Sequence, residues 1–175
     1  TASVLETAER LGIRGLFGPA WMDRGPDPSA ALWRAPEEFA AEIDALGARF
    51  HGADDGRLRI ALCPRFIPSV TNPVWRELAA RPEWRELAIH THGAETREEV
   101  EEVRRLTGGT PAAWYASLPG AAGRIKMAHG VWLDDADRRA LRGSGTAVLH
   151  CPGSNFKLGS GICDVAALER ADVPI

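Results

Sequence analysis

The chain has 175 residues, a length typical of one domain and at most two. Hydrophobic residues make up 45% of it and charged residues 26%, a balance that supports a buried core and argues against wholesale disorder. The net charge is −3, and the sequence has neither a basic stripe nor an apolar run of the roughly 18 residues that a membrane helix needs, so we expect no nucleic-acid partner and no membrane.

Short apolar runs that suit buried strands recur along the whole sequence. They predict strands over residues 13–18, 58–64, 87–92, 124–129 and 146–150, and a further run starts at residue 173 and stops at 175. Helical patterns lie between these runs. Residues 36–50 carry apolar side chains three or four positions apart, as one buried stripe requires, at Phe39, Ile43, Leu46 and Phe50.

Three shorter helices are predicted further along the chain, over residues 96–106, 134–142 and 164–171. Thr96 followed by Glu99 fits a capping box, in which two side chains satisfy free N–H groups at a helix start. The other two helices each open near an Asp, a residue type that is favoured at helix N-termini.

The alternation of strands and helices predicts a parallel sheet covered by helices. An open dinucleotide-binding sheet is the weaker alternative, because no GxGxxG motif follows the first strand. A closed (β/α)8 barrel needs about 250 residues and eight strands. The fold class is therefore predicted to be α/β, a partial (β/α)8 TIM barrel, with this chain as its middle. Residues 24–36, rich in proline, are expected to form a loop over the barrel mouth.

Four of the five histidines fall at the C-terminal ends of predicted strands. They are His90, His92, His129 and His150. A barrel brings these strand ends together around one mouth, so we expect the imidazoles to share a site. The alternative is that each histidine caps its own strand and binds a nearby carbonyl.

His92 and Glu95 form an H-x-x-E pattern where a strand meets a helix. A neutral imidazole is a good ligand for zinc or ferrous iron, and a nearby carboxylate can take a proton from metal-bound water and pass it to a leaving nitrogen. Glu95 is also explained as a first-turn carboxylate favoured by the helix dipole. His90 shares a strand face with His92, so the two could chelate one ion together.

Five sequence blocks carry a family resemblance that covers nearly the whole chain. The blocks are LFGPAWMDRG, ALCPRFIPS, HTHGAETREEVEEV, KMAHGVWLDDADRRAL and GTAVLHCPGSNFKLGSGI. In order and spacing they resemble the metal-dependent amidohydrolase superfamily, in the branch that includes cytosine, guanine and S-adenosylhomocysteine deaminases and triazine hydrolases. The resemblance implies that residues 1–175 form the central part of the barrel domain, roughly strands three to seven with their helices. The first two strands, the eighth strand and a flanking small β domain would then be absent.

The resemblance also implies a role for several residues. His92 matches a metal-binding histidine, Glu95 the carboxylate that shuttles protons, and His129 the histidine that orients the attacking water. The chemistry would be hydrolytic deamination of a purine- or pyrimidine-like heterocycle. Side chains expected to contact the substrate or shape its pocket are Arg65, Ser69, Trp132, His150 and Asn155, with Trp132, like Trp21, placed to stack on a planar ring.

Metal ligands that this branch uses are missing from the chain. The H-x-H of the first strand is absent, the Asp after the eighth strand lies beyond residue 175, and only the second histidine of the pair at 90 and 92 matches a ligand. We therefore expect one divalent ion, zinc with iron as the alternative, in the whole protein and an inactive segment when this chain stands alone.

Two alternatives to a deaminase stay open at this stage. One is a triazine-type dechlorinating hydrolase on the same scaffold, and the other is an inactive barrel fragment with a binding or assembly role. Three scattered cysteines favour a reducing, cytoplasmic setting over a disulfide framework. The expected partner is a small heterocyclic substrate, and a homodimer or higher oligomer is left open.

Overall fold

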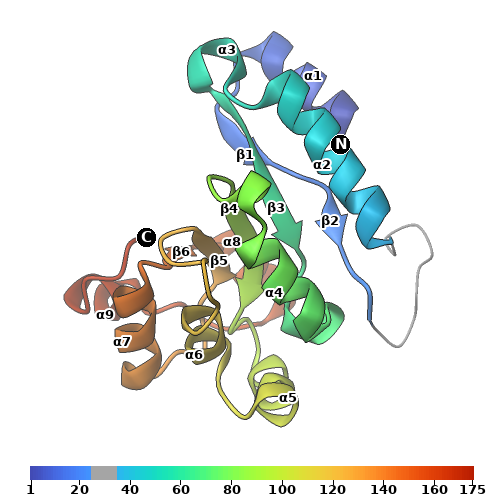
Figure 1. Ribbon diagram of the computed structural model, residues 1–175. Coiled ribbons are helices and arrows are strands. Elements are labelled where there is room, and N and C mark those ends of the chain that lie inside the picture. Colours follow the sequence, from blue (N-terminus) through green and yellow to red (C-terminus); the bar gives the residue numbers. More distant parts are fainter. Residues whose placement is uncertain (25–34) are drawn as a thin grey trace.

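The computed structural model describes residues 1–24 and 35–175 (Figure 1). The loop predicted over the barrel mouth, residues 24–36, therefore lies almost entirely outside the described residues. Within the described part, no helix is both long enough and apolar enough to cross a membrane.

The described strands form one curled parallel sheet. They pair in the order β1 (Gly15–Phe17), β3 (Leu58–Pro64), β4 (Ala88–Gly93), β5 (Ile125–His129) and β6 (Ala147–Leu149), and the short β2 (Ala20–Trp21) also pairs with β3. The five predicted strands are confirmed. β2 was not predicted, since two residues are too few to show a period.

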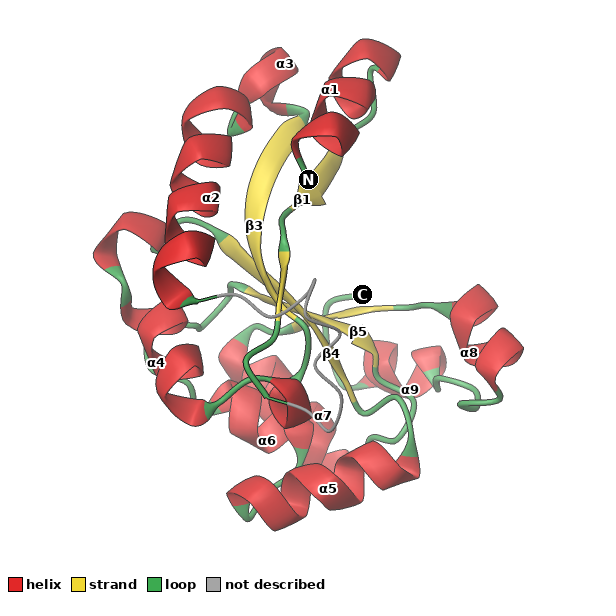
Figure 2. Ribbon diagram, turned by 90° about the vertical axis from the view of Figure 1, so that its right-hand side faces the viewer, coloured by secondary structure: helices red, strands yellow, loops and turns green. Residues whose placement is uncertain are grey.

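Helices connect the strands. They are α1 (Ala2–Leu11), α2 (Pro36–Phe50), α3 (Ala53–Gly56), α4 (Asn72–Ala80), α5 (Arg97–Thr107), α6 (Pro111–Ala116), α7 (Asp135–Ser144), α8 (Pro152–Leu158) and α9 (Val165–Arg170), with 3-10 turns at Ile67–Ser69 and Pro82–Trp84. Figure 2 shows α2, α4, α6 and α5 in an arc beside the sheet. The arrangement is half of an α/β barrel, as predicted.

Two predictions about local structure are wrong. Residues 173–175 form no strand, although the Pro174 carbonyl accepts one hydrogen bond from the Val148 N–H of β6, at 2.8 Å. Trp21 does not face a substrate site, because its ring is 2% exposed and stacks on Phe39 of α2 with 4.5 Å between ring centroids. Burial of an aromatic ring in the core outweighs its position at a strand end.

The loop after β4 ends where α5 begins, and the loop after β5 ends where α7 begins. Capping residues fix both helix starts. Asp134 and Asp137 form a reciprocal capping box at α7. At α5, Thr96 Oγ1 accepts the Glu99 N–H, which is half of the predicted capping box. The Glu99 carboxylate instead binds two N–H groups earlier in the loop, and this difference matters for the site described below.

β4 presents alternating faces to the helices and to the barrel interior. Ile89, Thr91 and Gly93 are buried, whereas His90 and His92 alternate with them. Thr91 Oγ1 lies 3.1 Å from the Tyr115 hydroxyl of α6, which identifies the helix-facing side. His90 and His92 therefore share the inner face, as predicted.

Candidate active site

Three residues predicted to act together meet at the carboxyl ends of β4 and β5. The rings of His92 and His129 have centroids 5.4 Å apart and planes inclined by 28°. Nε2 of His129 lies 3.5 Å from Oε2 of Glu95. The ring of His90 lies one step down the strand, with its centroid 6.3 Å from that of His92.

The ring of His92 is held in one tautomer by the preceding strand. Its Nδ1 lies 2.8 Å from the Arg65 carbonyl oxygen, and since a carbonyl only accepts, Nδ1 carries the proton. Burial, aided by the charges of His129 and Arg65, lowers the pKa of His92 below its ordinary value. The neutral ring therefore leaves Nε2 with a free lone pair, which is the form that ligates a metal.

A buried hydrogen-bond network anchors the backbone of His92. The Tyr115 hydroxyl donates to the His92 carbonyl at 2.8 Å, and Tyr115 is 1% exposed. Thr91 Oγ1 donates to the same Arg65 carbonyl at 3.1 Å, and the His92 N–H reaches that oxygen at 3.0 Å. Sequence reasoning missed Thr91 and Tyr115, because a lone Tyr in an unpredicted helix gives no signal of its distant partner.

The loop that carries Glu95 has a constrained backbone. Ala94 is fully buried with φ 53°, a left-handed conformation that is uncommon for a residue with a side chain. The Glu99 carboxylate accepts the Ala94 N–H at 3.2 Å and the Glu95 N–H at 2.7 Å. The Ala94 carbonyl accepts N–H groups from Val131 and Trp132, at 2.8 and 2.9 Å. These bonds tie the Glu95 loop to the loop after β5.

His129 is buried and also adopts an uncommon backbone conformation. It has φ 78° and is 5% exposed, and Nδ1 lies 2.8 Å from Oδ1 of Asn155 on α8. An amide oxygen only accepts, so Nδ1–H donates and Nε2 faces Glu95. Two strained residues, Ala94 and His129, thus flank the same cluster, and backbone strain of this kind concentrates at functional sites.

Asn155 was predicted to contact the substrate, and the structure places it behind His129. It is 1% exposed, and its Nδ2 has no hydrogen-bond partner among the described residues. Burying an amide N–H group without a hydrogen-bond partner costs free energy. The contact that the side chain does make is the hydrogen bond from His129 Nδ1 to its Oδ1. The substrate contact itself stays a prediction.

The other predicted pocket residues lie at the same end of the sheet but do not join the cluster. The exposed Arg65 guanidinium contacts the Met22 sulfur at 3.6 Å, and the buried Ser69 hydroxyl donates to the Phe66 carbonyl at 3.2 Å. His150 is exposed just after β6. Substrate contact by Arg65, Ser69 and His150 also stays a prediction.

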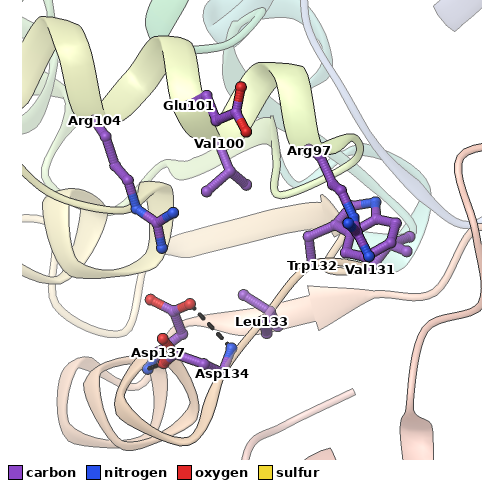
Figure 3. Close-up of a pocket in the computed structure, with 9 residues that line it drawn as sticks. All are labelled: Arg97, Val100, Glu101, Arg104, Val131, Trp132, Leu133, Asp134 and Asp137. Atoms are coloured by element: carbon purple, nitrogen blue, oxygen red, sulfur yellow. Dashed lines mark hydrogen bonds between the residues drawn. The ribbon is translucent and has the colours of Figure 1, made fainter.

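Trp132 faces the α5 side of the loop after β5, where it lines a separate cavity. The cavity has a volume of about 340 Å³ and is bordered by Arg97, Val100, Glu101, Arg104, Val131, Trp132, Leu133, Asp134 and Asp137. Figure 3 shows the Arg97 side chain against the Trp132 ring, where the guanidinium lies 4.2 Å from the ring centroid. This cavity does not include His92, Glu95 or His129.

Ser160 was missed by sequence reasoning as a member of the cluster. Its hydroxyl donates to Oε1 of Glu95 at 3.3 Å, and its own carbonyl accepts the Trp132 indole N–H at 2.9 Å. Nothing in the local sequence around Ser160 signals a partner 65 positions away.

Among the described residues, no group of three or more His, Cys, Asp or Glu side chains could together hold a metal ion. His92 fits the part of one imidazole ligand, because its Nδ1 is fixed and its Nε2 is free. The described residues thus place one imidazole with a free Nε2 beside a carboxylate and a second imidazole.

Comparison with known proteins gives consistent results. The model of the "Amidohydrolase family" matches residues 1–175. The chain is 32% identical over 172 residues to a 5-methylthioadenosine/S-adenosylhomocysteine deaminase of Haloarcula marismortui, covering 98% of this chain and 39% of that protein. It is 34% identical over 173 residues to an 8-oxoguanine deaminase of Pseudomonas aeruginosa, covering 95% and 38%. The chain therefore spans about two fifths of these relatives.

Solved structures support the half-barrel assignment. An adenosine deaminase from Xanthomonas campestris with bound zinc matches with a TM-score of 0.82 and 27% identity, over 97% of this chain and 37% of that one. These matches, together with the curled parallel sheet and the cluster at its carboxyl edge, confirm the expected resemblance. The chain belongs to the amidohydrolase family.

Proposed function

We propose that the protein to which this chain contributes the centre of a barrel is a metal-dependent aminohydrolase that deaminates a purine-like heterocycle. The observation that carries the proposal is the convergence of His92, Glu95 and His129, with 3.5 Å between His129 Nε2 and Glu95 Oε2 and 5.4 Å between the two rings. The relatives, a 5-methylthioadenosine/S-adenosylhomocysteine deaminase and an 8-oxoguanine deaminase, favour the substrate class.

The chemistry follows from which groups can hold or move a proton. Water adds to the ring carbon that bears the amino group, and Glu95 takes one proton from that water and passes it to the adjacent ring nitrogen. The carbon–nitrogen bond then breaks, Glu95 delivers the hydroxyl proton to the leaving nitrogen, and ammonia and a ring carbonyl result. His129 holds the attacking water through Nε2, the nitrogen that faces Glu95.

His92 would hold the metal through Nε2, with its remaining ligands outside the described residues. A divalent ion bound there, zinc or iron, supplies the acidity that makes water a nucleophile at neutral pH. The Xanthomonas deaminase structure contains bound zinc, which supports zinc over iron.

The remaining parts of the proposal concern the substrate side and the setting. In this proposal the side chains that contact the substrate or shape its pocket are those of Arg65, Ser69, Trp132, His150 and Asn155. Cys63, Cys151 and Cys163 are all free thiols, which is consistent with a reducing, cytoplasmic location.

Replacing Glu95 by Gln tests the proposal in the whole protein. Gln keeps the size of the side chain but cannot carry a proton between water and substrate, so ammonia release from 5-methylthioadenosine and 8-oxoguanine should fall by at least about 100-fold. Zinc content, measured by mass spectrometry, should not change. The exposed Glu98→Gln on α5 serves as the matched control and should retain wild-type activity.

Three results would contradict the proposal. Unchanged turnover in Glu95→Gln would reject the proton shuttle. Release of chloride from a chlorotriazine, without release of ammonia from either purine compound, would identify the dechlorinating alternative. A wild-type protein that is inactive with zinc on all these compounds would favour the binding or assembly role.

A further inference from the structure

The segment that follows α8 has a fixed conformation, set by the end of that helix. Gly159 adopts φ 70°, its N–H donates to the Phe156 carbonyl at 3.3 Å, and the Ser160 N–H donates to the Asn155 carbonyl at 2.9 Å. These two bonds form a Schellman motif, which requires the left-handed glycine. The position of Ser160 is therefore set relative to Asn155.

The loop after β5 holds the other side of the segment. The Trp132 indole N–H donates to the Ser160 carbonyl at 2.9 Å, and Arg97 lies over the Trp132 ring (Figure 3). A Cβ atom on Gly161 would lie 2.8 Å from Val131 Cγ1, so only glycine allows the backbone to approach this closely. The backbone of Ser160 is thus hydrogen-bonded to α8 on one side and to the loop after β5 on the other.

From this position Ser160 contacts the carboxylate of Glu95, and Asn155 contacts the imidazole of His129. Ser160 is 6% exposed, and its hydroxyl donates to Glu95 Oε1 at 3.3 Å. Asn155 Oδ1 accepts from His129 Nδ1 at 2.8 Å, while His129 Nε2 faces the other oxygen of Glu95. One short segment, residues 155–160, therefore contacts both the carboxylate and the imidazole.

We infer that Ser160 is a positioning residue for Glu95, which it holds by donating its hydroxyl to Oε1 so that Oε2 faces His129 and the reacting atoms. The inference rests on the proposed function, since it assigns to Ser160 a share of the proton transfer performed by Glu95. A hydrogen bond to a carboxylate favours the ionised form, the form that accepts a proton from water.

Ser160→Ala tests this role in the whole protein, with ammonia release from 5-methylthioadenosine or 8-oxoguanine as the assay. The variant should lose about tenfold in kcat with KM changed by less than about twofold, since a hydrogen bond to a charged group contributes roughly that factor. The acidic limb of the pH profile of kcat/KM should move upward by about half a pH unit, because the ionised carboxylate has lost a donor.

Two further variants separate positioning from structural support. Ser160→Thr keeps the hydroxyl and should restore both kcat and the position of the acidic limb. Ser117→Ala, at the exposed position just after α6, removes a hydroxyl that donates to the Trp114 carbonyl, and it should behave as wild type. If Ser160→Ala does not fold, Ser160→Gly removes the same hydroxyl and is expected to give the same profile.

Failure of the inference differs from failure of the proposed function. A wild-type protein that releases ammonia, with a hydroxyl-free variant that keeps its kcat and acidic limb, overturns the inference alone. A lower kcat with an unshifted profile that Thr does not restore assigns Ser160 to structural support and overturns it too. A zinc-loaded wild type that releases no ammonia from either compound rejects the proposed function, and the inference with it.

Discussion

His92 is made available as a ligand by a hydrogen bond on the opposite side of its ring. The Arg65 carbonyl fixes the proton of the neutral ring on Nδ1. Burial lowers the pKa of His92 although this hydrogen bond opposes the shift, so the neutral ring leaves Nε2 unprotonated. Nδ1 of His129 is held in a similar way, with an amide oxygen in place of a carbonyl. The tautomer of each imidazole is therefore set by a hydrogen-bond partner that sequence spacing does not reveal.

Glu99 gives a pH prediction at the residue scale. Burial, with a contribution from the charge of Glu95, raises its pKa above the ordinary value of 4.5, although backbone N–H donors oppose the rise. In the folded state Glu99 therefore keeps its proton to a higher pH than in the unfolded chain. As pH rises from about 4.5 through the raised pKa, the free energy of unfolding of the wild type should fall relative to that of Glu99→Gln.

Urea unfolding of the whole protein at closely spaced pH values measures this difference. The free energy of unfolding of the wild type, relative to that of the variant, should be highest below pH 4.5, which is the ordinary pKa of this carboxyl group. A difference that instead grows with pH would mean that the two N–H donors outweigh burial.

The elements of the fold divide into those with a local signal and those without one. α2 begins at Pro36 and ends at Phe50, as its apolar stripe predicts, and the strands from β3 onward lie close to their predicted ranges. α6 and α8 were not predicted, because they have six and seven residues and show too little periodicity. Tyr115, Asn155 and the segment before Ser160 belong to these helices, which explains why the supports of the site escaped sequence reasoning.

The Schellman motif of α8 provides a prediction at the element scale. Gly159→Ala places a side chain at φ 70°, with no atom within 4 Å of the new Cβ, so its cost is backbone strain alone. We expect a loss of about 1 kcal/mol in unfolding free energy and a lower kcat, because Ser160 would lose its fixed position.

Gly153→Ala is the matched control, since it lies in the same helix, also has free space around a new Cβ and needs no positive φ. It should be neutral or slightly stabilising. Equal effects of the two substitutions on unfolding free energy and kcat would contradict the claim that the Schellman motif fixes the position of Ser160.

At the scale of the whole molecule, a parallel sheet gathers side chains that are far apart in sequence. Strand alternation and the histidines at strand ends were enough to predict a half-barrel and the meeting of His92, Glu95 and His129. The burial of Trp21 could not be predicted, since a position beyond a strand end does not say whether a ring turns to the barrel mouth or to the helices. Such choices depend on tertiary packing.

The metal position is the most direct test of the site. Crystals of the whole protein grown with zinc, measured at the zinc absorption edge, locate the ion by anomalous scattering. We predict an anomalous peak about 2.0–2.1 Å from Nε2 of His92, with the Glu95 carboxylate beside the ion but not bound to it. A zinc ion held by other side chains, with Nε2 of His92 left unbound, would contradict the assignment.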